Sequence, residues 1–187
     1  MNVDISCIAE ENHRYAIHLA TFQNIIVFKN GSYDISATPF EQNPYEAVDF
    51  WRNISLAAEI LLKACLLKQH ILFFKKRSHS EYGEKVTAVA NKWLKETLRK
   101  LEIDYVAQIN TGSVSSALKH AEKKLFSRIS FDSEKAKLIS QMFYIIIRTR
   151  RNRNSHFFFS NQSHIVIAEV EMLFLPLLNL LEELYRL

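Results

Sequence analysis

Four arginines and a histidine lie close together late in the chain, and their side chains could do chemistry on a phosphate. The arginines are Arg148, Arg150, Arg151 and Arg153, and His156 follows them. An arginine guanidinium holds two phosphate oxygens in its planar fork and keeps its charge. Like charges this close together repel, so a bound anion, a phosphate above all, would stabilise the cluster. Histidine adds a group that exchanges protons near neutral pH.

The stretch from Arg151 to His156 reads R-N-x-x-x-H, because Asn152 directly follows Arg151. This pattern resembles the signature of HEPN domains, the all-α domains of many prokaryotic ribonucleases, toxins and antiviral effectors. Its place near the end of an apolar helical segment, late in the chain, is also typical of that family. Arg150 satisfies the looser pattern of an arginine followed by a histidine. We choose Arg151 because it carries the adjacent asparagine.

The resemblance implies a metal-independent endoribonuclease that cleaves RNA by attack of the ribose 2′-OH and needs no cofactor. It implies His156 as general base or acid, Arg151 on the phosphate and Asn152 shaping the site. The remaining arginines are expected to bind RNA phosphates without performing chemistry: Arg148, Arg150 and Arg153. Many members of this family act as toxins or antiviral effectors. The resemblance therefore also implies such a role, with an antitoxin or regulatory protein that restrains the activity. The alternative is a non-catalytic HEPN module that dimerises and binds RNA, a nucleotide or a partner protein.

The spacing of the motif limits how its side chains can meet. On a regular helix Arg151 and His156 are separated by about 140° around the axis, whereas Asn152 and His156 share a face. Arg151 and His156 therefore converge only if the helix ends or bends between them, or if a second subunit completes the site. HEPN ribonucleases are similar to the second case, with one composite site at a two-fold interface. The resemblance thus implies a homodimer.

The composition restricts the fold and the compartment. The 187 residues include only 3 Gly and 3 Pro, with 48% hydrophobic residues, which favours long helices over a strand-rich fold. The net charge of +4 is compatible with nucleic acid binding. Cys7 and Cys65 are expected to be reduced core residues, and no metal-ligand spacing is present. The N-terminus does not read as a signal peptide and no segment reads as a membrane span, so we expect a cytoplasmic protein.

The hydrophobic periodicity predicts one all-α, HEPN-like domain over residues 1–187, a bundle of about five or six helices. The expected helices cover residues 4–29, 43–76, 85–101 and 114–128, a motif helix capped by Asp132 or Ser133, and a final helix from about Ser163 that is kinked or split at Pro176. A strand over residues 24–28 is the alternative for the end of the first helix. The connections are expected at residues 31–43, 77–84 and 102–113.

The expected helix over 43–76 is apolar on two faces, so it is central or lies at a subunit contact. Asn43 and Pro44 are typical of a helix start. Within this helix Glu59 and Lys63 are similar to part of an E-x-L-x-K-A pattern common in HEPN domains. Two interpretations stay open: an ordinary surface pair one helical turn apart, or residues near the site.

Other charged and titratable residues carry weaker predictions. The helix over 114–128 has cations on its outer side: Lys119, Lys123, Lys124 and Arg128. Such a face is usually only solvated, and contact with RNA phosphates is the alternative. The histidines outside the motif are expected to be structural or solvated: His13, His18, His70, His79, His120 and His164.

Overall fold

The computed structural model describes residues 4–38, 43–71, 73, 75–76, 109–110, 113–146 and 164–187. Contacts divide the chain into two compact units, one made of Met1–Leu72 with Val114–Leu187 and one made of Phe73–Ser113. In the second unit, β3 (Lys75–Lys76) pairs antiparallel with β4 (Ile109–Asn110). The helix expected over 85–101 and the loop expected over 77–84 lie outside the described residues. Assignment of residues 1–187 to a single HEPN-like domain stays a prediction.

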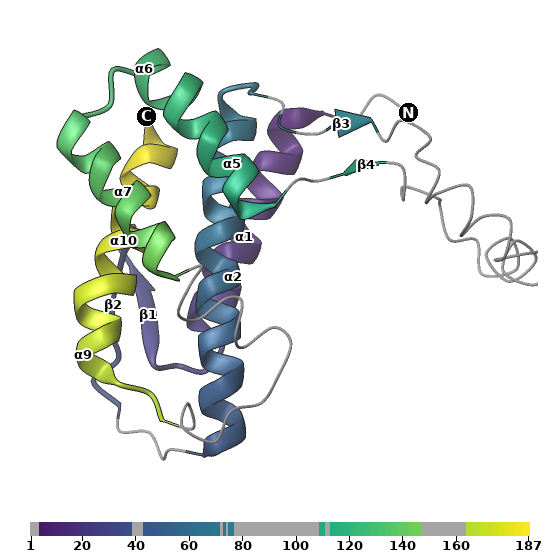
Figure 1. Cartoon of the computed structure of the whole chain (residues 1–187). Helices are drawn as coiled ribbons and strands as arrows, with labels where there is room; N and C mark the ends of the chain where they lie inside the picture. The colour runs from purple at the N-terminus through teal and green to yellow at the C-terminus, as the bar shows by residue number, and fades with distance from the viewer. Residues whose placement is uncertain are drawn as a thin grey trace, which may run out of the picture. The chain divides into compact units, whose positions relative to one another are not determined.

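The first unit is a bundle of helices around a central helix, α2 (Figure 1). α2 spans Pro44–Lys68, and α1 (Ile5–Thr21) packs along it. α10 (Leu175–Arg186) and α5 (Val114–His120) also contact α2. α7 (Ser133–Ile146) packs against α10. The all-α prediction is confirmed by this arrangement.

The central position of α2 accounts for its two apolar faces. Trp51, Leu61 and Leu66 on this helix are completely enclosed, and α1, α10 and α5 all pack against it. The apolar surface of α2 is therefore buried within its own unit and does not require a second subunit. The helix starts as predicted, because the Asn43 side chain accepts a hydrogen bond from the Tyr45 N–H at 2.9 Å.

α2 ends earlier than the expected residue 76. His70 has a φ of +52°, and its N–H donates to the Leu67 carbonyl at 2.8 Å. The N–H of Ile71 donates to the Leu66 carbonyl at 2.8 Å. These two bonds form a Schellman motif, which ends a helix and usually places glycine at the left-handed position. The prediction missed this end because histidine stands there and the apolar spacing continues beyond it.

A β-hairpin follows α1, so the first helix is shorter than predicted. β1 (Ile26–Lys29) pairs antiparallel with β2 (Ser32–Ile35). Asn30 and Gly31 form the two-residue turn with φ of +52° and +77°, the positive values that a type I′ turn requires. The helix prediction beyond Thr21 and the loop prediction across β2 are therefore wrong. The alternative of a strand at β1 is confirmed.

α1 packs through small side chains and not through the expected apolar stripe. The apolar spacing predicts an inner stripe of Ile5, Ile8, Tyr15, Leu19 and Ile26 on the predicted helix. Ala9, Ala16 and Ala20 are buried instead, whereas Tyr15 is 49% exposed. Small side chains at a contact let two helix axes come close together. The wrong prediction came from weighting large apolar residues over alanine.

The remaining helical segments follow the sequence prediction more closely. α5 continues into the π-helical segment η2 (Ala121–Leu125) and α6 (Phe126–Arg128), so the helix predicted over 114–128 is confirmed. The final helix consists of α9 (Ile167–Glu169), a π-helical segment η5 (Val170–Phe174) and α10. The irregular segment comes directly before the turn that contains Pro176, as the missing N–H of proline predicts. None of the helices in the described ranges combines the length and the apolar character needed to cross a membrane.

The two cysteines differ in exposure, and this predicts their reactivity. Cys65 is buried, its thiol lies 3.4 Å from the Leu181 carbonyl, and burial raises its pKa well above the usual range. Cys7 is exposed, so the prediction of a core cysteine is right for Cys65 and wrong for Cys7.

We expect Ellman's reagent to label one thiol, that of Cys7, rapidly in the native protein and both thiols in denaturant. Cys7→Ser should remove the rapid reaction; if it does not, the packing around Cys65 is wrong.

Candidate functional site

The residues of the R-N-x-x-x-H motif lie outside the described residues. This holds for all six predicted site residues: Arg148, Arg150, Arg151, Asn152, Arg153 and His156. The structure describes the chain up to Ile146 and again from His164. The elements that hold these two ends are therefore the structural frame of the candidate site.

α7 carries the chain to the motif. Asp132 caps its N-terminus, because its carboxylate accepts a hydrogen bond from the Lys135 N–H at 2.9 Å. Its core face consists of buried apolar side chains: Ile139, Met142, Phe143 and Ile146. The predicted motif helix is confirmed over Ser133–Ile146, and its last residue lies in the core, two positions before Arg148.

α2 holds the chain where it leaves the motif segment. The indole Nε1 of Trp51 donates to the carbonyl of His164 at 3.1 Å. The Trp51 ring packs against Phe174, with 5.6 Å between ring centroids, and Ile165 is buried nearby in sequence. Sequence reasoning could not find this bond, because its partner is a backbone group 113 residues away.

The Glu59–Lys63 pair forms as the spacing predicts, with 2.8 Å between Lys63 Nζ and a Glu59 carboxylate oxygen. The interpretation as a surface pair is wrong, because the two side chains are only 7% and 15% exposed. A buried pair is tolerated where good geometry and further contacts offset the loss of hydration. A position near the catalytic site stays a prediction for these two residues.

α7 also carries apolar side chains on its solvent side. Leu138 and Ile145 are 41% and 45% exposed, and seven residues, about two helical turns, separate them. They therefore lie on the same side of the helix, at the edge of its core face and partly in solvent. This exposed apolar side of α7 ends at Ile145, three residues before Arg148, the first arginine of the cluster.

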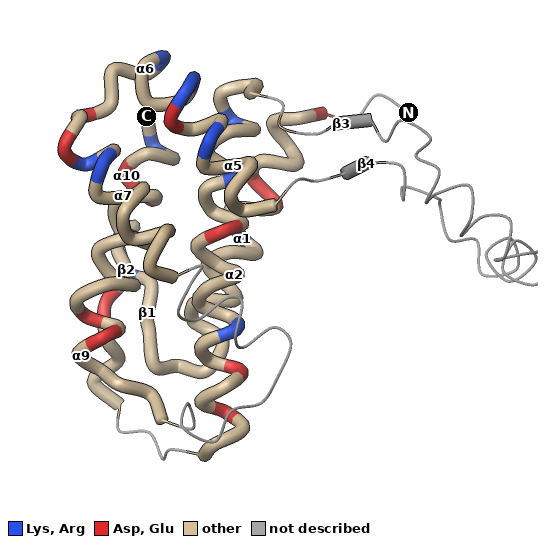
Figure 2. The backbone as a smooth tube through the Cα atoms, viewed as in Figure 1, with Lys and Arg blue, Asp and Glu red and all other residues tan. Residues whose placement is uncertain are grey.

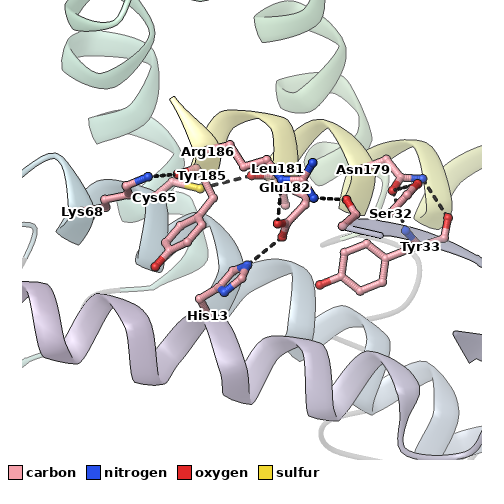
Figure 3. Close-up of polar contacts among 11 residues, drawn as sticks. His13, Ser32, Tyr33, Cys65, Lys68, Asn179, Leu181, Glu182, Tyr185 and Arg186 are labelled. Atoms are coloured by element: carbon pink, nitrogen blue, oxygen red, sulfur yellow. Dashed lines mark hydrogen bonds and ion pairs between the residues drawn. The ribbon is translucent and has the colours of Figure 1, made fainter. Parts of the chain in front are cut away.

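A buried polar cluster ties the first helix to the last (Figure 3). His13 Nε2 lies 2.7 Å from one carboxylate oxygen of Glu182, and Arg186 Nε donates to the other at 3.2 Å. The His13 ring stacks on Tyr185 at 4.0 Å. Glu182 is buried, and two partners satisfy its charge in the core. His13 is structural, as expected; Glu182 was missed, although its place four residues after Leu178 on the inner face was a signal.

The same cluster reaches the hairpin through β2. The Asn179 side chain accepts from the Tyr33 N–H at 2.8 Å and donates to the Tyr33 carbonyl at 3.0 Å. Burial, together with the nearby Glu182 charge, raises the pKa of the Tyr33 hydroxyl well above its usual range. This hydroxyl therefore stays protonated, and the two hydrogen bonds between Asn179 and the Tyr33 backbone tie the hairpin to α10.

The residues that the structure describes do not form a metal site. Within the described ranges, no group of three or more His, Cys, Asp or Glu side chains is arranged to hold a metal ion. No family model, curated protein or solved structure matches the chain. A functional assignment therefore depends on the residues of this chain, above all on the sequence between α7 and α9.

Proposed function

We propose that this protein is a HEPN-type, metal-independent endoribonuclease. The observation that carries the proposal is the intact sequence from Arg151 to His156, which begins five residues after the end of a helix anchored in the core. The all-α bundle and the net charge of +4 are compatible with this function. A role as a toxin or antiviral defence effector is part of the same proposal.

The proposed reaction is an internal transfer at phosphorus. One His156 removes the proton from the ribose 2′-OH, whose oxygen forms a bond to phosphorus while the bond to the 5′-oxygen breaks. A second proton donor, the His156 of the other protomer in a composite site, protonates the leaving 5′-oxygen. Arg151 stabilises the charge on the phosphate oxygens and Asn152 orients its neighbours. The products are a 2′,3′-cyclic phosphate and a 5′-hydroxyl.

The assay that tests the proposal uses the full chain without metal. Purified protein is incubated with labelled transfer RNA and messenger RNA in EDTA, and the new ends are analysed. We expect cleavage that leaves 2′,3′-cyclic phosphate ends. A strict requirement for Mg²⁺ would contradict the mechanism, and absence of cleavage would favour the non-catalytic HEPN module.

The homodimer is the second part of the proposal, and α7 supports it better than α2 does. The apolar faces of α2 are buried in its own unit, so they no longer favour a dimer. The exposed apolar side of α7, with Leu138 and Ile145, lies next to the motif in sequence and would gain from burial against a second copy. A second chain would also overcome the angular separation of Arg151 and His156, because each chain could supply one of the two side chains to a shared site.

Light scattering at micromolar concentration should therefore give the mass of a dimer. Leu138→Asp places a charge on the exposed side of α7 and should shift the mass toward the monomer. Met172→Asp is the matched control, because Met172 is an exposed apolar residue on η5 (79% exposed) and its replacement should leave the dimer intact. A wild-type monomer that still cleaves RNA would rule the dimer out.

Mixing two inactive variants tests whether the site is shared. Arg151→Ala and His156→Ala proteins are combined under conditions that allow subunit exchange. A site that needs Arg151 from one chain and His156 from the other regains one working copy in the heterodimer. Activity that returns on mixing would support such a site and would show that one His156 is sufficient. The reaction above, which uses both His156 side chains, predicts a heterodimer that stays inactive.

A further inference from the structure

Cationic side chains of the described residues fall into two groups. One group contacts carboxylates or backbone carbonyls: Arg14, Arg52, Lys63, Lys68, Lys135 and Arg186. The other group has no carboxylate partner among the described residues: Lys29, Lys119, Lys123, Lys124, Arg128 and Lys137. All members of the second group except Lys29 lie within residues 119–137. Within residues 119–137, Lys135 is paired with Glu183, and the other five cations have no carboxylate partner among the described residues.

These available cations gather at one end of the bundle. Figure 2 shows Lys and Arg concentrated over α5, α6 and the start of α7, with Asp and Glu more frequent around α9 and the start of α2. We call the following set the basic end: Lys119, Lys123, Lys124, Arg128 and Lys137, all exposed. Residues 119–137 contain six cations against three carboxylates, so this surface is positive on balance.

An open groove of about 470 Å³ lies at the basic end, between α6 and α7. Its polar lining consists mainly of hydroxyl groups, with one cation and one acid: Ser127, Ser130, Ser133, Ser140, Lys137 and Glu122. Serine hydroxyls both donate and accept hydrogen bonds, as phosphate oxygens and ribose hydroxyls require. The volume is within the range of pockets that hold small molecules, so a nucleotide unit fits.

The wall of the groove is fixed by the loop between α6 and α7. Ser130 has a φ of +51°, and its N–H donates to the Ser127 carbonyl at 3.3 Å. The Phe131 N–H donates to the Phe126 carbonyl at 2.9 Å, and the two rings stack with 5.9 Å between centroids. This is a second Schellman motif with its hydrophobic contact. It holds the serines in place without a ligand.

We propose that the basic end and its groove bind the sugar–phosphate backbone of single-stranded RNA that continues from the motif. This inference rests on the proposed ribonuclease function. α7 has 14 residues, with the groove at its start and its last residue two positions before Arg148 in the sequence, so the helix covers a distance of about 20 Å. A strand stacked at roughly 3.4 Å per nucleotide covers that distance with about six nucleotides. The substrate class is therefore RNA with a single-stranded stretch of at least that length, held without reading its bases.

RNA binding is tested in a His156→Ala background, which keeps the probe intact. The probe is a fluorescein-labelled single-stranded RNA of about 12 nucleotides. The test variant combines Lys123→Gln, Lys124→Gln and Lys137→Gln; Lys29→Gln is the control, an exposed lysine of β1 that also lacks a partner among the described residues.

The combined variant should lower the slope of log affinity against log salt by about 2, since each lost phosphate contact to a single strand removes about 0.7. Affinity should fall at least about tenfold. The Lys29→Gln control should bind as the parent does, and Glu122→Gln should bind more tightly. Unchanged affinity and salt slope in the combined variant would overturn the inference.

Cleavage with His156 intact separates this inference from the proposed function. For the probe of about 12 nucleotides the combined variant should raise KM with little change in kcat, whereas RNA of about four nucleotides, too short to reach the groove, should be cleaved as by the wild type. If the combined variant cleaves both RNAs as the wild type does, the basic end is not an RNA-binding surface, and the proposed ribonuclease function is unaffected. If the wild type neither binds nor cleaves RNA, both proposals fall.

Discussion

His156→Ala should lower the rate of RNA cleavage by about 10²–10⁴-fold, the usual contribution of a general acid or base. The imidazole is the group in the R-N-x-x-x-H motif that can exchange a proton near neutral pH. In a homodimer the substitution removes the proton acceptor and the proton donor together, so the loss should lie at the upper end of that range. The measurement is single-turnover cleavage of labelled RNA in EDTA.

The matched control is His18→Ala, because His18 is an exposed histidine on α1. This variant should cleave RNA as the wild type does. Arg151→Lys tests the second role: a lysine keeps the charge but loses the planar fork, so it should retain only part of the activity, and Arg151→Ala less still. Cleavage that survives both His156→Ala and Arg151→Ala would show that the site lies elsewhere.

Lys63→Met should lower the free energy of unfolding by about 3–5 kcal/mol, because it removes the cation from a buried ion pair. The side chain of Glu59 is only 7% exposed, so water cannot replace the lost partner. Urea denaturation at neutral pH measures the loss. The double variant Glu59→Leu/Lys63→Met should recover most of the stability, since an apolar pair of similar volume needs no hydration or ion pairing in the core.

Arg14→Met provides the comparison for this ion pair. Arg14 and Glu10 also form a pair one helical turn apart, but both side chains are mostly exposed. Its loss should cost no more than about 0.5 kcal/mol. A similarly small effect of Lys63→Met would contradict the buried pair. Loss of RNA cleavage in a Lys63→Met protein that remains folded would instead favour a position near the site.

The sequence predicts the features of this fold that depend on neighbouring residues. The helix starts at Asn43 and Asp132 were found, because a short side-chain oxygen reaches a backbone N–H two or three residues away. The helix end at His70 was missed, since its left-handed residue is not glycine. The hairpin at Asn30 was missed because the Asn-Gly pair was interpreted as a helix stop and not as a turn.

Candidate functional residues follow a similar division. The motif residues Arg151 and His156 were chosen by their resemblance to a family signature; they lie outside the described residues and stay a prediction. The buried partners His13 and Glu182 could not be paired from the sequence, because 169 residues separate them. The available cations of the basic end were visible as residues, but only the structure shows that other cations are neutralised and these are not.

The contact between His13 and Glu182 also sets the order in which this chain can fold during its synthesis. α1 and α2 emerge from the ribosome first, yet α2 needs α10 to cover one of its sides. Until α10 has been translated, part of the central helix faces water, and the polar group that holds α1 in place is missing. Domains with such long-range contacts close late. Under the proposed function, cleavage of RNA would begin only after the codons for α10 have been translated, because the helices that frame the motif are not packed before then.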